Sequence, residues 1–119
     1  MENDQNKEFI YDMDKFLHGF ELYFLHEYEE GGVGTFGYDK VKEMLNNSKL
    51  VGQHVLADFK SDQLRRYKDI EVSLNQMHEL LLERSCLTSE SSQIDILIKR
   101  CTKLKSALKK LRELVTGYA

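Results

Sequence analysis

The sequence predicts an all-α fold, an elongated antiparallel bundle of three helices whose C-terminal half has the pattern of a coiled coil. The chain contains no proline, so long helices are possible throughout. Apolar residues follow a heptad pattern near the C-terminus. Four of the seven glycines lie within residues 31–37, where they separate two helix-forming stretches.

We expect one helical domain over residues 1–119, since a chain of this length has room for a single core. Such a chain buries roughly two thirds of its unfolded surface, and only if its helices pack on one another. Apolar periodicity and the glycine and serine clusters predict helices at about 4–30, 38–84 and 92–116, with turns at 31–37 and 85–91.

The first helix, at about 4–30, is expected to fill the core with aromatic side chains. Its apolar positions recur three per heptad, which is the width of the core-facing stripe of a globular helix. These positions are Phe9, Ile10, Met13, Phe16, Leu17, Phe20, Tyr23 and Phe24. A groove for a hydrophobic ligand could present the same residue types, but packing in the core is their commoner use.

Residues 31–37 are expected to form the first turn, because each glycine costs about 1 kcal/mol relative to alanine within a helix. A phosphate-binding loop needs a strand before it and a Lys-Ser or Lys-Thr pair at its end. Here a predicted helix precedes the glycines and no such pair follows them. Phosphate binding is therefore not expected.

The stretch 38–84 has two interpretations. Its first half carries a patchy apolar stripe, whereas its second half has an a/d register formed by Tyr67, Ile70, Leu74, Met77 and Leu81 and supported by Leu64 and Leu80. The two registers are out of phase around residues 60–63, and residues 46–52 form a second weak point. One long helix, continuous or kinked, gives a three-helix bundle, and a break gives four helices. The long helix is favoured, because neither weak point has the proline or glycine pair that usually enforces a turn.

The last helix, at about 92–116, follows a serine-rich turn and carries a heptad seam. The seam residues are spaced alternately by three and four and are Ile94, Leu97, Cys101, Leu104, Leu108, Leu111 and Val115. An apolar row of this kind must be buried against another helix. The serines of the turn could also be phosphorylated at the helix N-terminus, although no kinase motif is identified there.

Charge is distributed unevenly along the chain, although the net charge is only −3. Residues 1–40 hold ten acidic residues against three lysines, whereas residues 99–112 hold seven basic residues and no acidic one. Acidic and basic helices that lie side by side, within one bundle or between two copies, would partly neutralise each other. A basic face for nucleic acid is the weaker alternative, because the remaining acidic chain would repel a polyanion.

No catalytic site, metal site or cofactor is predicted. Two histidines have a carboxylate four residues later, His26 with Glu30 and His54 with Asp58. A metal ion needs three or four converging ligands, and no sequence motif supplies them. These histidines are interpreted as exposed or helix-capping residues.

The two cysteines, Cys86 and Cys101, do not indicate a disulfide framework. Cys101 lies on the apolar seam, where a thiol behaves as a small apolar group, and Cys86 lies in a predicted turn. A nucleophilic pair of Cys86 with His78 lacks an oxyanion loop in the sequence. The free thiols, the lack of a secretory signal and the lack of an apolar run of about 18 residues predict a cytoplasmic protein without a membrane span.

These features predict a non-enzymatic helical module, such as a small adaptor, chaperone or assembly subunit, that binds another protein or a second copy of itself through helix seams. The residues expected to bind the partner form two apolar rows, Tyr67, Ile70, Leu74, Met77 and Leu81 with Leu97, Leu104, Leu108, Leu111 and Val115. Arg100, Lys105 and Arg112 flank the seam and are expected to select the partner by charge. Two alternatives stay open: a nucleic-acid-binding regulator that uses the basic last helix, and an acidic inhibitor or immunity-type protein that blocks the groove of an enzyme.

Overall fold

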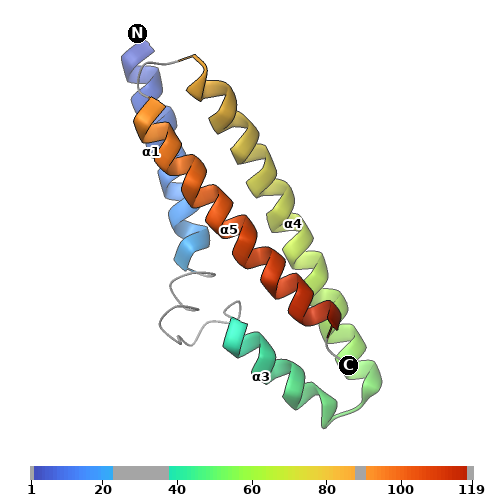
Figure 1. Ribbon diagram of the computed structural model, residues 1–119. Coiled ribbons are helices and arrows are strands. Elements are labelled where there is room, and N and C mark those ends of the chain that lie inside the picture. The colour runs from blue at the N-terminus through green and yellow to red at the C-terminus, as the bar shows by residue number, and fades with distance from the viewer. Residues whose placement is uncertain (1, 23–37, 88–90, 118–119) are drawn as a thin grey trace.

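The computed structural model describes residues 2–22, 38–87 and 91–117, and these residues form four helices and no strand. In chain order the helices are α1 (Glu2–Glu21), α3 (Tyr38–Lys49), α4 (Gln53–Ser85) and α5 (Ser91–Gly117). They assemble into an elongated bundle that measures 59 × 24 × 17 Å (Figure 1). The predicted all-α bundle is therefore confirmed.

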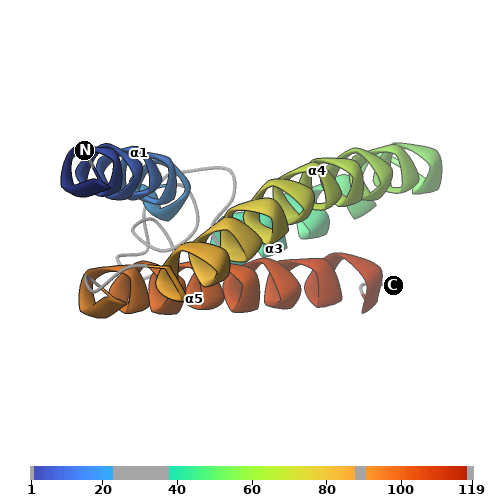
Figure 2. The same cartoon turned by 90° about the horizontal axis from the view of Figure 1, so that it is seen from above.

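Helices α4 and α5 form the long axis of the bundle. They contain 33 and 27 residues, which corresponds to lengths of about 50 and 40 Å, and they run antiparallel. Helix α1 packs on the N-terminal part of α5, while α3 packs on α4 and on the C-terminal part of α5 (Figures 1 and 2). The two shorter helices therefore cover different halves of the long pair.

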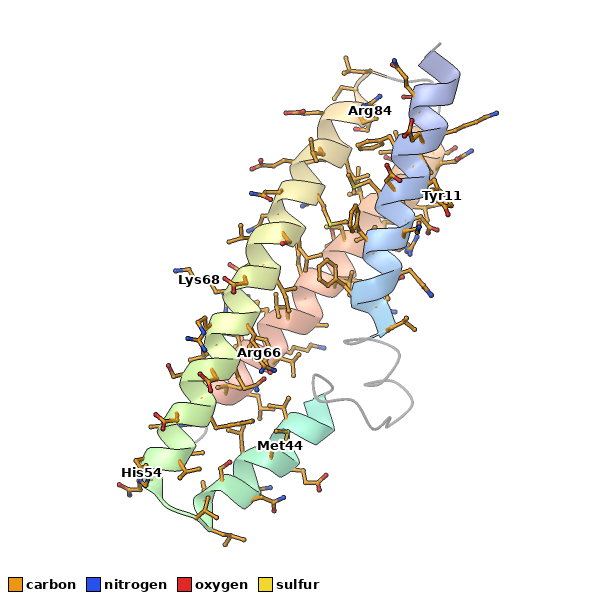
Figure 3. The ribbon with its side chains drawn as sticks, turned by 180° about the vertical axis from the view of Figure 1, so that it is seen from behind. Tyr11, Met44, His54, Arg66, Lys68 and Arg84 are labelled. Carbon is orange, nitrogen blue, oxygen red and sulfur yellow. The ribbon has the colours of Figure 1, made fainter. Side chains whose placement is uncertain are left out.

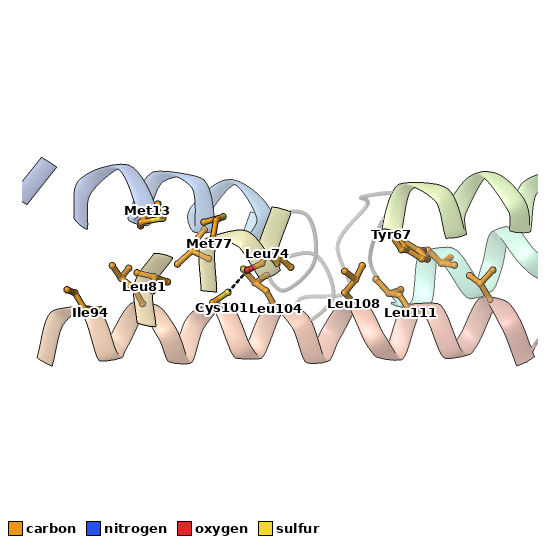
Figure 4. Packing of buried hydrophobic residues seen from close by; sticks show 14 of the residues in the cluster. Met13, Tyr67, Leu74, Met77, Leu81, Ile94, Cys101, Leu104, Leu108 and Leu111 are labelled. Carbon is orange, nitrogen blue, oxygen red and sulfur yellow. Dashed lines mark hydrogen bonds between the residues drawn. The ribbon is translucent and has the colours of Figure 1, made fainter. Parts of the chain in front are cut away.

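The core is a row of apolar side chains that follows α5 along its length (Figure 4). Every residue of the predicted C-terminal seam is buried, namely Ile94, Leu97, Cys101, Leu104, Leu108, Leu111 and Val115. The other helices contribute Met13, Leu17, Val41, Leu45, Tyr67, Leu74, Met77 and Leu81 to the same cluster. The prediction that the seam is buried against another helical surface is confirmed.

The stretch 38–84 is broken into two helices, so the favoured single helix is wrong and the alternative with a break is right. Helix α3 ends at Lys49 and α4 begins at Gln53. Gly52 between them has φ 125° and ψ 158°, a backbone conformation that is essentially restricted to glycine. One glycine thus reverses the chain without proline or a second glycine. The other weak point, at 60–63, lies inside an uninterrupted α4.

Several apolar positions that the sequence assigns to the core lie at the surface. Phe16 of α1 is 61% exposed, and Leu80 of α4 is also exposed. Helix α1 packs chiefly on α5, with further contacts from Arg84 of α4, so its neighbours cover only part of its wide apolar stripe. Met13 and Leu17 are buried, whereas the neighbouring positions Phe9, Ile10 and Phe20 are partly buried.

Some sequence predictions fall on residues that the structure does not describe. These are the turn at 31–37, the C-terminal part of the predicted first helix from 23 to 30, and the middle of the serine-rich turn at 88–90. Within the described ranges, none of the helices combines the length and the apolar character that crossing a bilayer requires.

Candidate interaction surface

The two apolar rows predicted to bind a partner are brought together inside the chain, one against the other. In α4 the residues Tyr67, Leu74, Met77 and Leu81 are buried and Ile70 is partly buried, and in α5 the buried residues are Leu97, Leu104, Leu108, Leu111 and Val115. Because α4 and α5 cover each other, these rows exclude water without a second chain. Their role in binding a partner stays a prediction, and it would require the two helices to separate.

Cys101 lies in the middle of the contact between α4 and α5. Its thiol donates a hydrogen bond to the backbone carbonyl of Leu74 at 3.4 Å (Figure 4). Burial raises the pKa of the Cys101 thiol, which keeps the sulfur protonated and unreactive. Cys101 therefore packs as a small core residue, as its place on the seam predicts.

Arg100, the first of the basic residues predicted to select a partner, binds two carboxylates of α1. Its Nε and Nη2 donate to the two oxygens of Glu21 at 2.9 and 2.7 Å, and its Nη1 donates to Asp14 at 2.5 Å. The hydrogen bonding that Arg100 donates to Glu21 is the largest of the effects that raise the pKa of Arg100. These contacts pair the basic α5 with the acidic α1 within one bundle.

Lys105 and Arg112, the other two predicted selectors, contact α4. Arg112 donates a hydrogen bond to the carboxylate of Glu71, and the Lys105 ammonium lies 3.3 Å from Nδ1 of His78. All three predicted selectors thus make contacts between helices of the same chain. Their role in selecting a partner by charge stays a prediction.

The candidate metal ligands do not converge within the part of the chain that the structure describes. His54 and Asp58 are exposed on the first turns of α4, and no group of three or more His, Cys, Asp or Glu side chains in the described ranges is arranged to hold a metal ion. His26 and Glu30 lie outside those ranges. Cys86 is exposed at the end of α4, while His78 lies against Lys105.

An open groove lies beside the contact between α1 and α5. It has a volume of about 400 Å³ and is lined by Lys7, Ile10, Tyr11, Asp14, Gln93, Ile96, Leu97 and Arg100. The side chains of Tyr11 and Ile96 are each 59% exposed, and Figure 3 shows Tyr11 on the side of α1 that is turned away from α4. Two large apolar side chains from different helices therefore border the same opening.

Neither Tyr11 nor Ile96 was among the residues singled out from the sequence. Both lie off the predicted apolar stripes, where a heptad pattern normally has polar residues. The signal that could have identified them is this mismatch between residue type and register, as with Ile96 two positions after the buried Ile94. No family model, curated protein or solved structure matches the chain, so its function is inferred from its own residues.

Proposed function

We propose that the chain is a non-enzymatic helical module that binds another protein, or a second copy of itself, through helix packing. One observation supports this most directly: with its own seam closed, the bundle still presents Tyr11 and Ile96 at one open groove. Burying apolar surface contributes roughly 25 cal/mol per Å², and grouped exposed apolar side chains are typical of interaction sites. Small adaptors, chaperones and assembly subunits all act through such surfaces.

Site-specific crosslinking in the native host cell tests the proposal. Ile96 is replaced by the photo-reactive residue p-benzoylphenylalanine, and the matched control places the same residue at Val72, an exposed position of α4 outside the groove. We expect a defined partner band from position 96 and none from position 72. Light scattering over a range of protein concentrations detects self-association. A chain that stays monomeric and crosslinks to nothing at position 96 contradicts the proposal.

A nucleic-acid-binding regulator is the second candidate, because lysines recur along the outer side of α5. Lys99, Lys103 and Lys110 are exposed and are spaced by four and seven residues, which places them on one face of the helix. Binding to duplex DNA across a salt series tests it. Affinity that falls steeply with salt and is lost in the Lys103→Glu, Lys110→Glu double variant supports this candidate, and no binding at low salt excludes it.

A further inference from the structure

Helix α1 rests on α4 and α5 through few buried side chains. Among its described side chains only Asn6, Met13 and Leu17 are buried, whereas α5 buries a row of seven. Met13 points from α1 toward the side on which Met77 lies (Figure 4), and both belong to one buried cluster. Because apolar burial stabilises in proportion to its area, α1 is held less firmly than α5.

Two arginines, one from each long helix, bind α1 near its two ends. Arg84 of α4 donates a hydrogen bond to the side-chain oxygen of Asn6 at 3.0 Å, and its guanidinium lies 4.5 Å from the centre of the Phe9 ring. Arg100 of α5 binds two carboxylates farther along α1. We call the surface of α4 and α5 that α1 covers between these arginines the α1 seat.

The α1 seat is apolar between its two arginines. Four buried residues lie in this stretch, Met77 and Leu81 of α4 and Ile94 and Leu97 of α5. They belong to the same cluster as Met13 and Leu17 of α1. An amphipathic helix therefore fits this surface with apolar residues four positions apart, as Met13 and Leu17 are.

Helices α4 and α5 are joined to each other without the help of α1. Across their contact Cys101 donates a hydrogen bond to the carbonyl of Leu74, and Arg112 donates one to Glu71. Helix α3 packs on the other half of this pair (Figure 1). These contacts do not involve α1, so they stay in place when α1 leaves the seat.

Helix α1 and the seat carry opposite charge. Helix α1 holds six acidic residues and two lysines, and Arg100 of the seat binds two of the carboxylates, those of Asp14 and Glu21. The Arg100 side chain is only 25% exposed while α1 covers it. An occupant that covers Arg100 without supplying a carboxylate would leave a partly buried cation unpaired, which is costly. The seat therefore favours an acidic helix.

The acidic residues of α4 and α5 in this stretch lie away from the seat. At about 100° of rotation per residue, Glu79 and Glu83 lie about 140° and about 100° from Arg84 around α4. Asp95 lies about 140° from Arg100 around α5. Among the described residues, the charge that the seat presents to α1 is therefore positive.

We infer that α1 is an autoinhibitory helix and that the α1 seat binds an acidic amphipathic helix of a partner protein in its place. The inference rests on the proposed function and adds the location and the chemistry of the partner to it. Ile96 borders the contact between α1 and α5, so a helix in the seat also lies beside position 96. Because α1 competes for the seat, the apparent Kd of the partner is its intrinsic Kd divided by the fraction of chains whose seat is open.

A peptide with the sequence of residues 2–22 serves as the first probe, because α1 is the helix that the seat holds in the structure. It carries fluorescein at its N-terminus, and fluorescence anisotropy measures its Kd for the full chain. We expect the Asp14→Asn, Glu21→Gln double variant of the protein to bind it about tenfold more tightly than wild type does, since weakening α1 opens the seat. Asp62→Asn, an exposed change outside the seat, should leave the Kd within about twofold.

Further peptides test the charge of the occupant. Replacing Asp14 and Glu21 of the first peptide by lysine should raise its Kd about tenfold or more. A designed helix of unrelated sequence, with leucines at i, i+3, i+4 and i+7 and glutamates on its flanks, should bind the double variant, and its lysine counterpart should not. Binding that does not depend on charge overturns the inference. So does binding of the α1 peptide alone, which would assign the seat to a second copy of this chain.

The methionine methyl groups show where the peptide binds. Met13 lies on α1, and Met44 lies on α3 outside the seat. When an unlabelled peptide occupies the seat of a protein with isotope-labelled methionine methyls, the Met13 signal should move to the position of an exposed methionine and the Met44 signal should stay. A peptide that binds while the Met13 signal is unchanged occupies another surface, and this overturns the inference.

The peptides and the crosslinker at position 96 separate the two proposals. If circular dichroism shows that the double variant is unfolded, Glu21→Gln alone takes its place, with tighter binding again expected. If no peptide binds even the weakened variant, α1 is not an exchangeable occupant and the inference falls. If the crosslinker still captures a partner in that case, the proposed module stands.

Discussion

Arg100 of α5 binds Glu21 of α1 through two parallel hydrogen bonds, one from Nε and one from Nη2 to the two carboxylate oxygens. The two side chains are only 25% and 22% exposed. This bidentate geometry is the strongest and most directional form of an arginine–carboxylate pair. It joins helices that are far apart in the sequence, so the uneven charge of the chain has a structural role in holding α1 on α5.

Replacing Glu21 by glutamine should weaken the docking of α1. We expect the free energy of unfolding to fall by about 1–3 kcal/mol, because a partly buried, charge-assisted pair loses its anionic partner. Urea denaturation followed by circular dichroism measures the change. Asp62→Asn is the matched control, since Asp62 pairs with Arg65 at 3.0 Å on an exposed part of α4, and its cost should stay below about 1 kcal/mol. Equal losses for the two variants would argue against a special role of Arg100.

The contact between α4 and α5 should dominate the stability of the bundle. Leu74→Ala removes a fully buried side chain from this contact and should cost about 2–5 kcal/mol in the free energy of unfolding. Leu82→Ala removes the same group from an exposed position of the same helix and should cost about 0.5 kcal/mol or less. Denaturant titrations of both variants test this. A similar loss for both would mean that Leu74 is not packed in the core as described.

The burial of α5 could be predicted residue by residue, because alternating spacings of three and four depend only on helix geometry. Leu104 and Leu108 are buried, as the spacing predicts, and the spacing predicts this whether the partner helix belongs to the same chain or to another. The partner itself could not be read from the spacing, since a seam closes equally well on a helix of the same chain or of another. The ion pair between Arg100 and Glu21 could likewise not be predicted, because it depends on where α1 packs on α5.

Features that depend on tertiary packing could not be predicted from the sequence. The break at Gly52 requires only one glycine, because α3 gains contacts with α4 and α5 by folding back. Phe16 belongs to a stripe that is wider than its contact with α5. Tyr11 and Ile96 form a groove only because two remote helices lie in parallel. The apolar pattern of a helix shows which face can be buried, whereas the packing of the helices on one another determines which apolar residues are covered.

Two glycine-to-alanine substitutions should have opposite effects. Gly52 has φ 125°, so Gly52→Ala should cost about 1–3 kcal/mol through backbone strain. The space around it is not the cause, since an added Cβ would come no closer than 3.8 Å to His54. Gly19 lies within α1, and a Cβ there would meet nothing within 4 Å, so Gly19→Ala should stabilise by about 0.5–1 kcal/mol. Thermal unfolding of both variants shows whether each substitution raises or lowers the stability. Two destabilised variants would contradict the described conformation of Gly19 or its surroundings.

Tyr67 carries a polar group into the core. Its side chain is fully buried, and its hydroxyl has no hydrogen-bond partner among the described residues. Burial is the main cause that raises the pKa of Tyr67 above its ordinary value of 10.0. The folded protein therefore holds this proton at a pH where the unfolded chain releases it.

The stability of the protein should consequently fall in alkaline solution because of Tyr67. Above about pH 10 the folded state binds more protons than the unfolded state, so this residue's contribution is present below that pH and declines by up to about 1.4 kcal/mol per pH unit above it. Tyr67→Phe should remove this decline and raise the stability near pH 7 by about 1 kcal/mol, because no unpaired hydroxyl is then buried. Urea denaturation at about pH 7 and about pH 11, with Tyr11→Phe as the exposed control, tests both effects. If wild type and Tyr67→Phe lose stability equally over this range, the hydroxyl of Tyr67 is not buried without a partner.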